Sequence, residues 1–167
     1  MSLVLRELAP TASGERDFLD LLAWTYREGI ATQIILYDRG DLDRLLLMTK
    51  AGYLPPAGWS VLAVLGRYAS GQRSSPKDLL AFLDDGTFPI APWMVCAFGP
   101  DEIRCLITGA LFGGDVRTGF ENNLCLPDGS IAPDNAEMMG TVAAAALNLN
   151  IQLCDADAVR ARWLPPA

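Results

Sequence analysis

The chain has 167 residues, 51% of them hydrophobic and 20% charged, so it can bury the core of one globular domain and is not disordered. Its net charge of −7, without a local basic stripe, argues against a nucleic-acid partner. It contains no histidine, which excludes a Ser-His-Asp or Cys-His nucleophile and a His-ligated metal site built from this chain alone.

Cysteine spacing and hydropathy indicate a cytoplasmic, soluble protein. No C-x-x-C pair occurs among the four cysteines, Cys96, Cys105, Cys125 and Cys154. Since no signal peptide follows Met1, we expect four free thiols in a reducing compartment. Apolar stretches such as Trp59–Leu65 are too short to cross a bilayer, so we expect no membrane contact.

Short apolar runs alternate with amphipathic segments, which is the pattern of consecutive βα units. In chain order we expect a strand at residues 3–8, a helix at 15–28, a strand at 32–37, a helix ending near Gly52, a strand at 60–65, a helix opened by Ser75 and Pro76, a strand at Trp93–Ala97, a helix starting near Glu102, and a strand at 115–120. Asp134 and Asp155 are the expected caps of two further helices.

The expected strands are apolar on both faces, as in a parallel sheet covered on each side. Such units fit either an open doubly wound sheet or part of a (β/α)₈ TIM barrel. The absence of G-x-G-x-x-G and G-x-x-x-x-G-K-[ST] fingerprints favours the barrel. A complete barrel needs about 250 residues and eight units, and the sequence predicts only five.

Polar residues follow the expected strands, and the richest group lies at residues 117–123. Arg117 can bind a substrate carboxylate there, while Glu121 can serve a metal or a proton. The alternative is that Arg117 and Glu121 form a structural ion pair and that Asn122 and Asn123 cap a loop.

Two earlier strand ends carry further candidates. Arg6 and Glu7 are either a catalytic pair or a salt bridge. Gly66 and Arg67 begin a cationic loop that reaches a helix start at Ser75, which is a candidate phosphate site or an ordinary solvated loop. We interpret Cys96 as a core residue.

Residues 113–136 resemble the β-keto acid cleavage enzyme family. The segment reads GGDVRTGFENNLCLPDGSIAPDNA, and the family has a Gly-Gly-His-Val-Arg-x-Gly-x-Glu-Asp/Asn-Asn stretch followed by a Leu-x-x-Gly-x-x-Ala-x-x-Asn-Ala stretch. Upstream segments beginning at Arg6, Gln33, Val64 and Cys96 resemble the same family in the same order. The resemblance covers nearly the whole chain.

This resemblance implies a homo-oligomeric (β/α)₈ enzyme that binds a divalent metal, usually zinc. Such an enzyme joins a β-keto acid to acetyl-CoA and cleaves the adduct into acetoacetate and a new CoA ester. Residues 1–167 would then be one domain, the C-terminal portion of the barrel with strands four to eight, and the first three βα units would be absent.

Carried over by position, Glu121 matches the metal-ligating glutamate and Arg117 the substrate-side arginine. Asn122 stands where an aspartate pairs with that arginine in the acid/base step, and an amide cannot accept a proton as a carboxylate does. Asp115 replaces a histidine. The remaining metal ligands of the family, a His-x-His on an early strand, have no counterpart in this sequence.

Two hypotheses follow. The first is a C-terminal part of a metal-dependent β-keto acid cleavage enzyme, with catalytic roles for Arg117 and Asn122 and a metal role for Glu121. In it Arg6, Glu7, Gly66, Arg67 and Ser75 contact the substrate or CoA. The second is a non-catalytic half-barrel that binds a partner chain or an acyl ligand.

Overall fold

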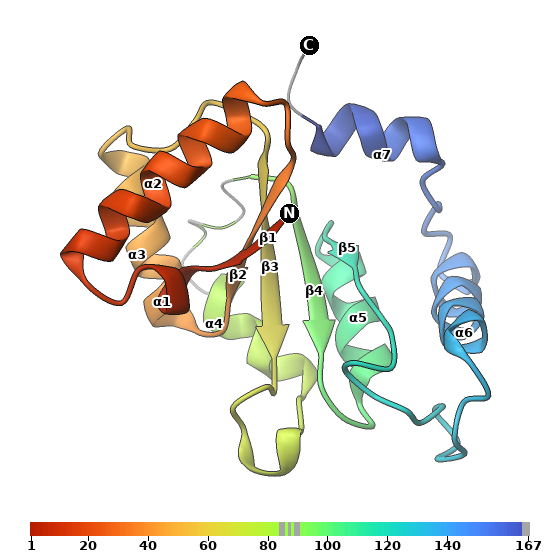
Figure 1. The fold of residues 1–167 in the computed structure, drawn as a ribbon. Coiled ribbons are helices and arrows are strands. Elements are labelled where there is room, and N and C mark those ends of the chain that lie inside the picture. The colour runs from red at the N-terminus through yellow and green to blue at the C-terminus, as the bar shows by residue number, and fades with distance from the viewer. Residues whose placement is uncertain (84–85, 87, 89–90, 165–167) are drawn as a thin grey trace.

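A single parallel sheet organises the molecule (Figure 1). The computed structural model describes residues 1–83, 86, 88 and 91–164. Its five strands are adjacent in chain order, and each pair of neighbours is parallel. They are β1 (Ser2–Val4), β2 (Thr32–Leu36), β3 (Trp59–Leu65), β4 (Trp93–Ala97) and β5 (Asp115–Val116).

Helices connect the strands and follow the last of them. The α-helices are α1 (Leu5–Leu8), α2 (Ala12–Arg27), α3 (Arg39–Lys50), α4 (Leu80–Leu83), α5 (Glu102–Leu111), α6 (Asn135–Asn148) and α7 (Ala156–Trp163). Two 3₁₀ turns, η1 (Ser70–Gln72) and η2 (Pro76–Leu79), lie between β3 and α4. This order confirms the predicted succession of βα units.

The main core lies between the sheet and the connecting helices. Alternate strand residues such as Ile34, Val61 and Val95 pack there against Phe18 of α2 and Leu106 of α5. Every buried helix side chain in the two hydrophobic clusters of the described residues belongs to this layer.

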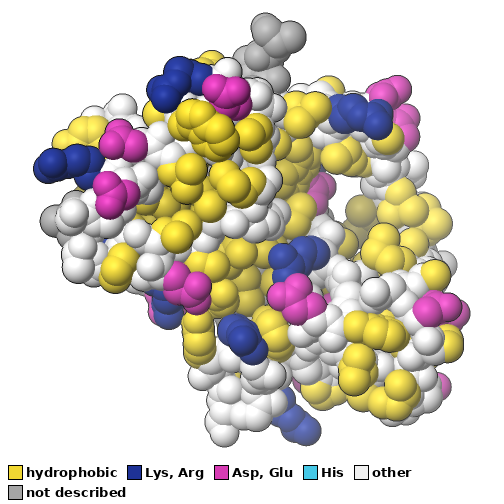
Figure 2. All heavy atoms as spheres, in the orientation of Figure 1, with side chains coloured by type: hydrophobic (Ala, Val, Ile, Leu, Met, Phe, Trp, Pro, Cys, Tyr) yellow, Lys and Arg dark blue, Asp and Glu magenta, His cyan; other side chains and the backbone are white. Residues whose placement is uncertain are grey.

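The opposite, inner face of the sheet carries a second cluster of strand and strand-end residues. Leu62, Val64, Cys96 and Phe98 are buried in it, and Ile35, Tyr37 and Met94 flank them. Figure 2 shows hydrophobic side chains gathered along the middle of the view, where Figure 1 has the strands. A doubly wound sheet has helices on both faces and a reversal in strand order, so the observed winding is the one-sided kind that is compatible with part of a (β/α)₈ barrel.

Two expected strands are shorter than predicted. Residues 5–8 form a helical turn, closed by the Ala9 N–H donating to the Leu5 carbonyl (2.9 Å), because Leu5 and Ala9 both bury their side chains there. The strand predicted at 115–120 ends at Val116, although the Arg117 N–H still donates to the Val95 carbonyl (2.9 Å).

The predicted helix caps are present. Ser75 and Asp78 form a capping box with Pro76 in the first turn of η2, which continues into α4. Asp134 accepts from the Glu137 N–H, and Asp155 accepts from the Ala158 N–H. Each cap satisfies an amide at a helix start that has no partner inside the helix.

The last two helices form an arm beside the sheet (Figure 1). α6 packs on α5 and buries Met138, Val142 and Ala146. α7 is fastened to β5 by Asp115, which accepts from Arg162 (3.1 Å) and from the Trp163 indole (3.1 Å). Asp115, the residue in place of the family histidine, is therefore the anchor of α7.

The four cysteines are free thiols, as predicted. Among the described residues, no helix is both long and apolar enough to span a bilayer.

Candidate functional site

The carboxyl ends of the strands share one edge of the sheet, where parallel α/β proteins place their functional loops. Arg6 lies in α1, two residues after the end of β1, and Tyr37 directly follows β2. Gly66 follows β3, Phe98 follows β4 and Arg117 follows β5.

Arg117 and Glu121, in the loop after β5, form the ion pair that is the structural alternative predicted for these two residues. The Arg117 Nη2 donates to Glu121 Oε2 at 2.9 Å. The Glu121 side chain is 73% exposed and that of Arg117 33% exposed. Glu121 Oε1 has no partner among the described residues. The pair therefore holds a carboxylate in place while leaving one of its oxygens free for a ligand or a proton.

The two asparagines of this loop are buried and differ in their bonding. Asn123 caps the loop as expected, because its side chain donates to the Cys125 carbonyl (2.7 Å) and accepts from the Cys125 N–H (3.0 Å). The Asn122 carbonyl accepts from the Gly99 N–H (3.1 Å). The Asn122 side chain interacts with the Cys96 thiol, and its Nδ2 has no hydrogen-bond partner of ordinary geometry in the described part of the chain.

Glu102 is a site residue that the sequence pattern did not indicate, because an acid at this position is typical of a helix start. Its side chain is fully buried, its Oε1 accepts from the Thr118 hydroxyl (2.9 Å), and its Oε2 has no partner in the described structure. Burial raises the pKa of this carboxyl. Glu102 thus ties the loop after β5 to the first turn of α5.

The predicted pairing of Arg6 with Glu7 is wrong. Arg6 forms ion pairs with Asp38 and with Asp41 (2.8 Å) instead, and Glu7 is exposed. The helical turn after β1 directs Arg6 towards the start of α3, where both aspartates lie. Burial opposes the charge of Arg6, but the hydrogen bonds to Asp41 and Asp38 raise the pKa of its guanidinium.

Two tyrosines complete this side of the edge. The Arg6 guanidinium lies 5.2 Å from the Tyr37 ring centroid and 5.5 Å from that of Tyr68, and the two rings meet edge to face at 4.8 Å. A cavity of about 370 Å³ opens beside them and is also lined by Gly66 and Arg67. The structure thus brings Arg6, Gly66 and Arg67 together.

The loop from Gly66 to Ser75 is tightly packed. Gly66 has φ +79°, and a Cβ at this position would lie 2.8 Å from the backbone of Arg73 and Ser74. The Ser74 N–H and hydroxyl both donate to the Phe98 carbonyl (2.9 and 2.8 Å). The Ser75 N–H, at the helix start where this loop ends, donates to the Asp78 carboxylate (2.8 Å).

Cys96 is a core residue, as interpreted. Its side chain is fully buried on the inner face of the sheet, and burial raises the pKa of its thiol to about 12. A neutral thiol is a poor nucleophile, so Cys96 contributes packing to this edge.

The described residues do not form a metal centre. They contain no group of three or more Cys, Asp or Glu that could hold a metal ion. Structural and catalytic zinc sites use three or four protein ligands, whereas Glu121 stands alone and pairs with a cation. The donor set of this chain therefore does not fit zinc without further ligands.

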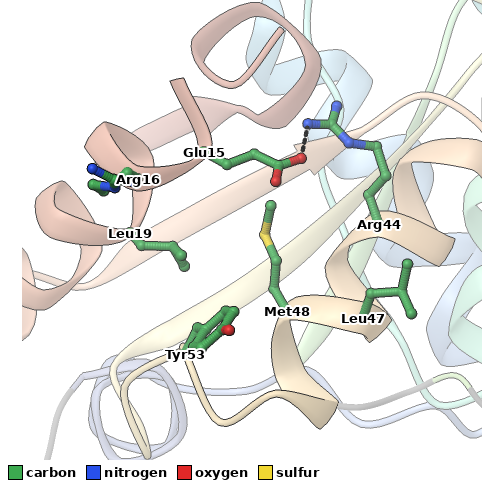
Figure 3. Close-up of a pocket in the computed structure, with 7 residues that line it drawn as sticks. All are labelled: Glu15, Arg16, Leu19, Arg44, Leu47, Met48 and Tyr53. Atoms are coloured by element: carbon green, nitrogen blue, oxygen red, sulfur yellow. Dashed lines mark hydrogen bonds and ion pairs between the residues drawn. The ribbon is translucent and has the colours of Figure 1, made fainter. Parts of the chain in front are cut away.

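A second cavity, of about 470 Å³, lies on the outer helical layer (Figure 3). Leu19, Met48 and Tyr53 point towards one another there, and Arg44 pairs with Glu15 at 2.7 Å. None of the predicted site residues lines it. Because this cavity lies away from the carboxyl ends of the strands, we place the candidate site at the carboxyl edge of the sheet.

A parallel sheet with helices on one face and charged loops at its carboxyl edge is an α/β fold compatible with part of a (β/α)₈ barrel. The sequence model of the beta-keto acid cleavage enzyme family matches residues 9–163. The chain belongs to this family.

Three curated relatives agree with this assignment. A 3-keto-5-aminohexanoate cleavage enzyme of Fusobacterium nucleatum is 27% identical over 133 residues, which is 79% of this chain and 47% of that protein. An enzyme of the same name from Acetoanaerobium sticklandii is 24% identical over 77% of this chain and 46% of its own length. A 3-oxoadipate:acetyl-CoA acetyltransferase of Cupriavidus necator is 27% identical over 75% and 45%, respectively. The chain spans just under half the length of these relatives.

Proposed function

We propose that this chain supplies the C-terminal βα units of a β-keto acid cleavage enzyme. The reaction takes a β-keto acid and acetyl-CoA to acetoacetate and a new acyl-CoA. The observation that carries the proposal is the Arg117–Glu121 pair on the loop after β5, at the carboxyl edge of a parallel sheet. The family match and the names of the relatives, two cleavage enzymes and an acetyltransferase, support it.

In this proposal Arg117 binds the carboxylate of the β-keto acid, since a guanidinium offers paired donors of the right geometry. Glu121, held by Arg117, faces the reacting groups with its free oxygen. Asn122 follows Glu121 on this loop, and its amide side chain is buried. Because an amide does not take up a proton at neutral pH, the proton must be moved by another group.

The five strands would correspond to strands four to eight of a (β/α)₈ barrel in a cytoplasmic homo-oligomer. The one-sided helical cover and the single pairing of β1 and of β5 within the described sheet support this placement. In a zinc-dependent enzyme Glu121 would be one ligand, and the others would come from βα units outside this sequence.

The open sheet favours a second candidate function, a non-catalytic half-barrel that binds a partner chain. Strand edges with free N–H and C=O groups are templates for pairing with another chain, and β1 has a neighbour on one side only. The two candidates differ in what they require of the loop after β5. A β-keto acid cleavage enzyme needs Arg117 and Glu121 to be able to take part in catalysis, whereas a non-catalytic half-barrel does not.

A loop graft tests the proposed function. Residues 115–130 replace the matching segment of the Fusobacterium nucleatum relative, and acyl-CoA formation is measured by mass spectrometry. We expect the chimera to turn over, and Glu121→Gln or Arg117→Gln to lower its rate by about 10²-fold or more. Ser130→Ala, in an exposed turn, is the control and should leave the rate unchanged.

The same chimera can contradict the proposal. A folded chimera that stays inactive until Asn122→Asp restores turnover would show that this loop has lost its catalytic competence. That result would favour the non-catalytic half-barrel.

A further inference from the structure

Three cations that form no ion pair with a described acidic residue lie in one loop of the molecule. Of the 13 Lys and Arg residues, seven form ion pairs. The six without an ion pair to a described acidic residue are Arg16, Arg27, Lys50, Arg67, Arg73 and Lys77. The last three lie within residues 66–77, the cationic loop, and all three are exposed.

The cationic loop is held rigidly although its charges face solvent. Gly66 and Gly99, with φ +79° and +89°, allow the backbone around residues 72–74 to approach so closely that a Cβ on either would lie within 2.8 Å of it. Ser74 fixes the loop to the Phe98 carbonyl through two hydrogen bonds. A rigid loop loses little conformational entropy when a ligand binds, so the backbone that carries these cations needs little ordering on binding.

The cationic loop adjoins the Arg117–Glu121 loop through the turn after β4. The Arg67 guanidinium lies over the Phe98 ring (5.3 Å), and the next residue, Gly99, donates its N–H to the Asn122 carbonyl (3.1 Å). The two loops therefore lie on either side of one turn at the carboxyl edge. An elongated ligand can reach both.

We propose that the cationic loop binds the phosphate groups of acetyl-CoA, with Arg67, Arg73 and Lys77 as the contacts. This site rests on the proposed function, which supplies a CoA ester as the polyanionic ligand. A chain of net charge −7 repels such a ligand elsewhere, and the lower part of Figure 2 shows Lys and Arg side chains on and beside the loop below β3. Tyr68, 62% exposed beside the cavity at Gly66, offers a face for stacking the adenine ring.

Asp78, the one acid that follows in this segment, does not cancel the site. Its carboxylate accepts from the Ser75 N–H in the capping box of η2. The backbone amides of Ser74 and Ser75 are therefore not available to phosphate, and binding depends on the three side-chain cations. This makes the site sensitive to charge-removing substitutions.

The test compares two triple variants of the full chain that remove the same charge. One is Arg67→Gln/Arg73→Gln/Lys77→Gln, and the control is Arg16→Gln/Arg27→Gln/Lys50→Gln, which removes the other three unpaired cations. Binding of acetyl-CoA and of acetyl-dephospho-CoA is measured by titration calorimetry at two salt concentrations, and circular dichroism checks the fold. We expect the loop variant to weaken acetyl-CoA binding by about tenfold or more and to lower its salt dependence, since each lost phosphate contact releases fewer counterions.

The control variant should stay within about twofold of the wild-type affinity, and loss of the ligand's 3′-phosphate should weaken wild-type binding more than it weakens the loop variant. Equal weakening in both triple variants would show only a general charge effect and overturn the proposal, as would a wild-type chain that binds neither ligand. Binding through the loop together with an inactive loop graft would contradict the proposed function and leave this site standing.

Discussion

Two buried side chains at the candidate site each carry a polar atom without a hydrogen-bond partner in the described structure. Asn122 belongs to the Arg117–Glu121 loop, and Glu102 lies in the first turn of α5. Such atoms are rare in native proteins, because an unpaired buried polar group costs about 1–3 kcal/mol. Because both atoms lie at a candidate site, we infer that the protein tolerates this loss of stability there for the sake of function. Each can be examined by a near-isosteric substitution.

Glu102→Gln should stabilise the protein in a pH-dependent way. Burial raises the pKa of Glu102 in the folded protein, so folding favours its protonated form. The stability that this residue contributes is therefore complete below the unfolded pKa of about 4.3 and is lost as pH rises through the folded pKa. The amide avoids this loss, so we expect the variant to be about 1–2 kcal/mol more stable than wild type at pH 7. The difference should disappear near pH 4.

Denaturant unfolding at the two pH values measures this effect, with the exposed Glu28→Gln as the control that should change nothing. A Glu102→Gln variant less stable than wild type at pH 7 would show that the ionised carboxylate is the favoured form, held by Thr118.

Gly66→Ala should destabilise the protein more than Gly52→Ala does. Both residues have positive φ, +79° and +71°, but the added Cβ meets the backbone of Arg73 and Ser74 only at Gly66 and finds open space at Gly52. We expect a cost of about 1 kcal/mol at Gly52 and about 3 kcal/mol at Gly66. Thermal unfolding measures both, and equal costs would contradict the close packing of the cationic loop.

At the scale of elements, Arg6 joins the turn after β1 to the start of α3. Its partner Asp41 is almost fully buried and also accepts from the Tyr37 N–H (2.9 Å). Removing the cation leaves a buried carboxylate with only neutral donors, which is costly. Arg6 therefore has a structural role whatever else it contacts.

Arg6→Gln should lower the free energy of unfolding by about 2–3 kcal/mol. The matched control is Arg104→Gln, which breaks an exposed pair with Asp101 and should cost less than about 0.5 kcal/mol. Urea unfolding distinguishes them. Similar small losses in both variants would mean that Asp41 is satisfied without Arg6.

Local sequence patterns predicted most of the helices and strands. Where the structure differs from the prediction, long-range contacts determine the local conformation. β4 and the caps Ser75, Asp134 and Asp155 follow from apolar runs and from short-range hydrogen bonding, which a sequence displays directly. Residues 3–8 begin with an apolar run, which predicts a strand, but residues 5–8 form a helical turn, and Arg6 pairs there with residues more than 30 positions away.

The candidate site shows the same limit. Spacing indicated the Arg117–Glu121 pair, which is four residues apart on one loop. It could not indicate Glu102, whose contact with Thr118 depends on how α5 and the loop after β5 meet, nor the choice of Asp38 and Asp41 over Glu7 by Arg6.

Over the whole molecule, the sheet is covered by helices on one face, and its inner face carries only strand and strand-end residues in the described structure. The chain matches just under half the length of the curated relatives. Both facts fit a molecule whose candidate site is completed by further βα units, because the donors at the carboxyl edge include a single candidate metal carboxylate, Glu121.

The most direct test of this account is CoA-ester formation by the chain alone, incubated with zinc, acetyl-CoA and a short β-keto acid and followed by mass spectrometry. If further βα units complete the site, we expect no CoA ester above the uncatalysed background and less than one tightly bound zinc per chain. Turnover by the lone chain with one equivalent of bound zinc would contradict it and show that these 167 residues hold the complete site.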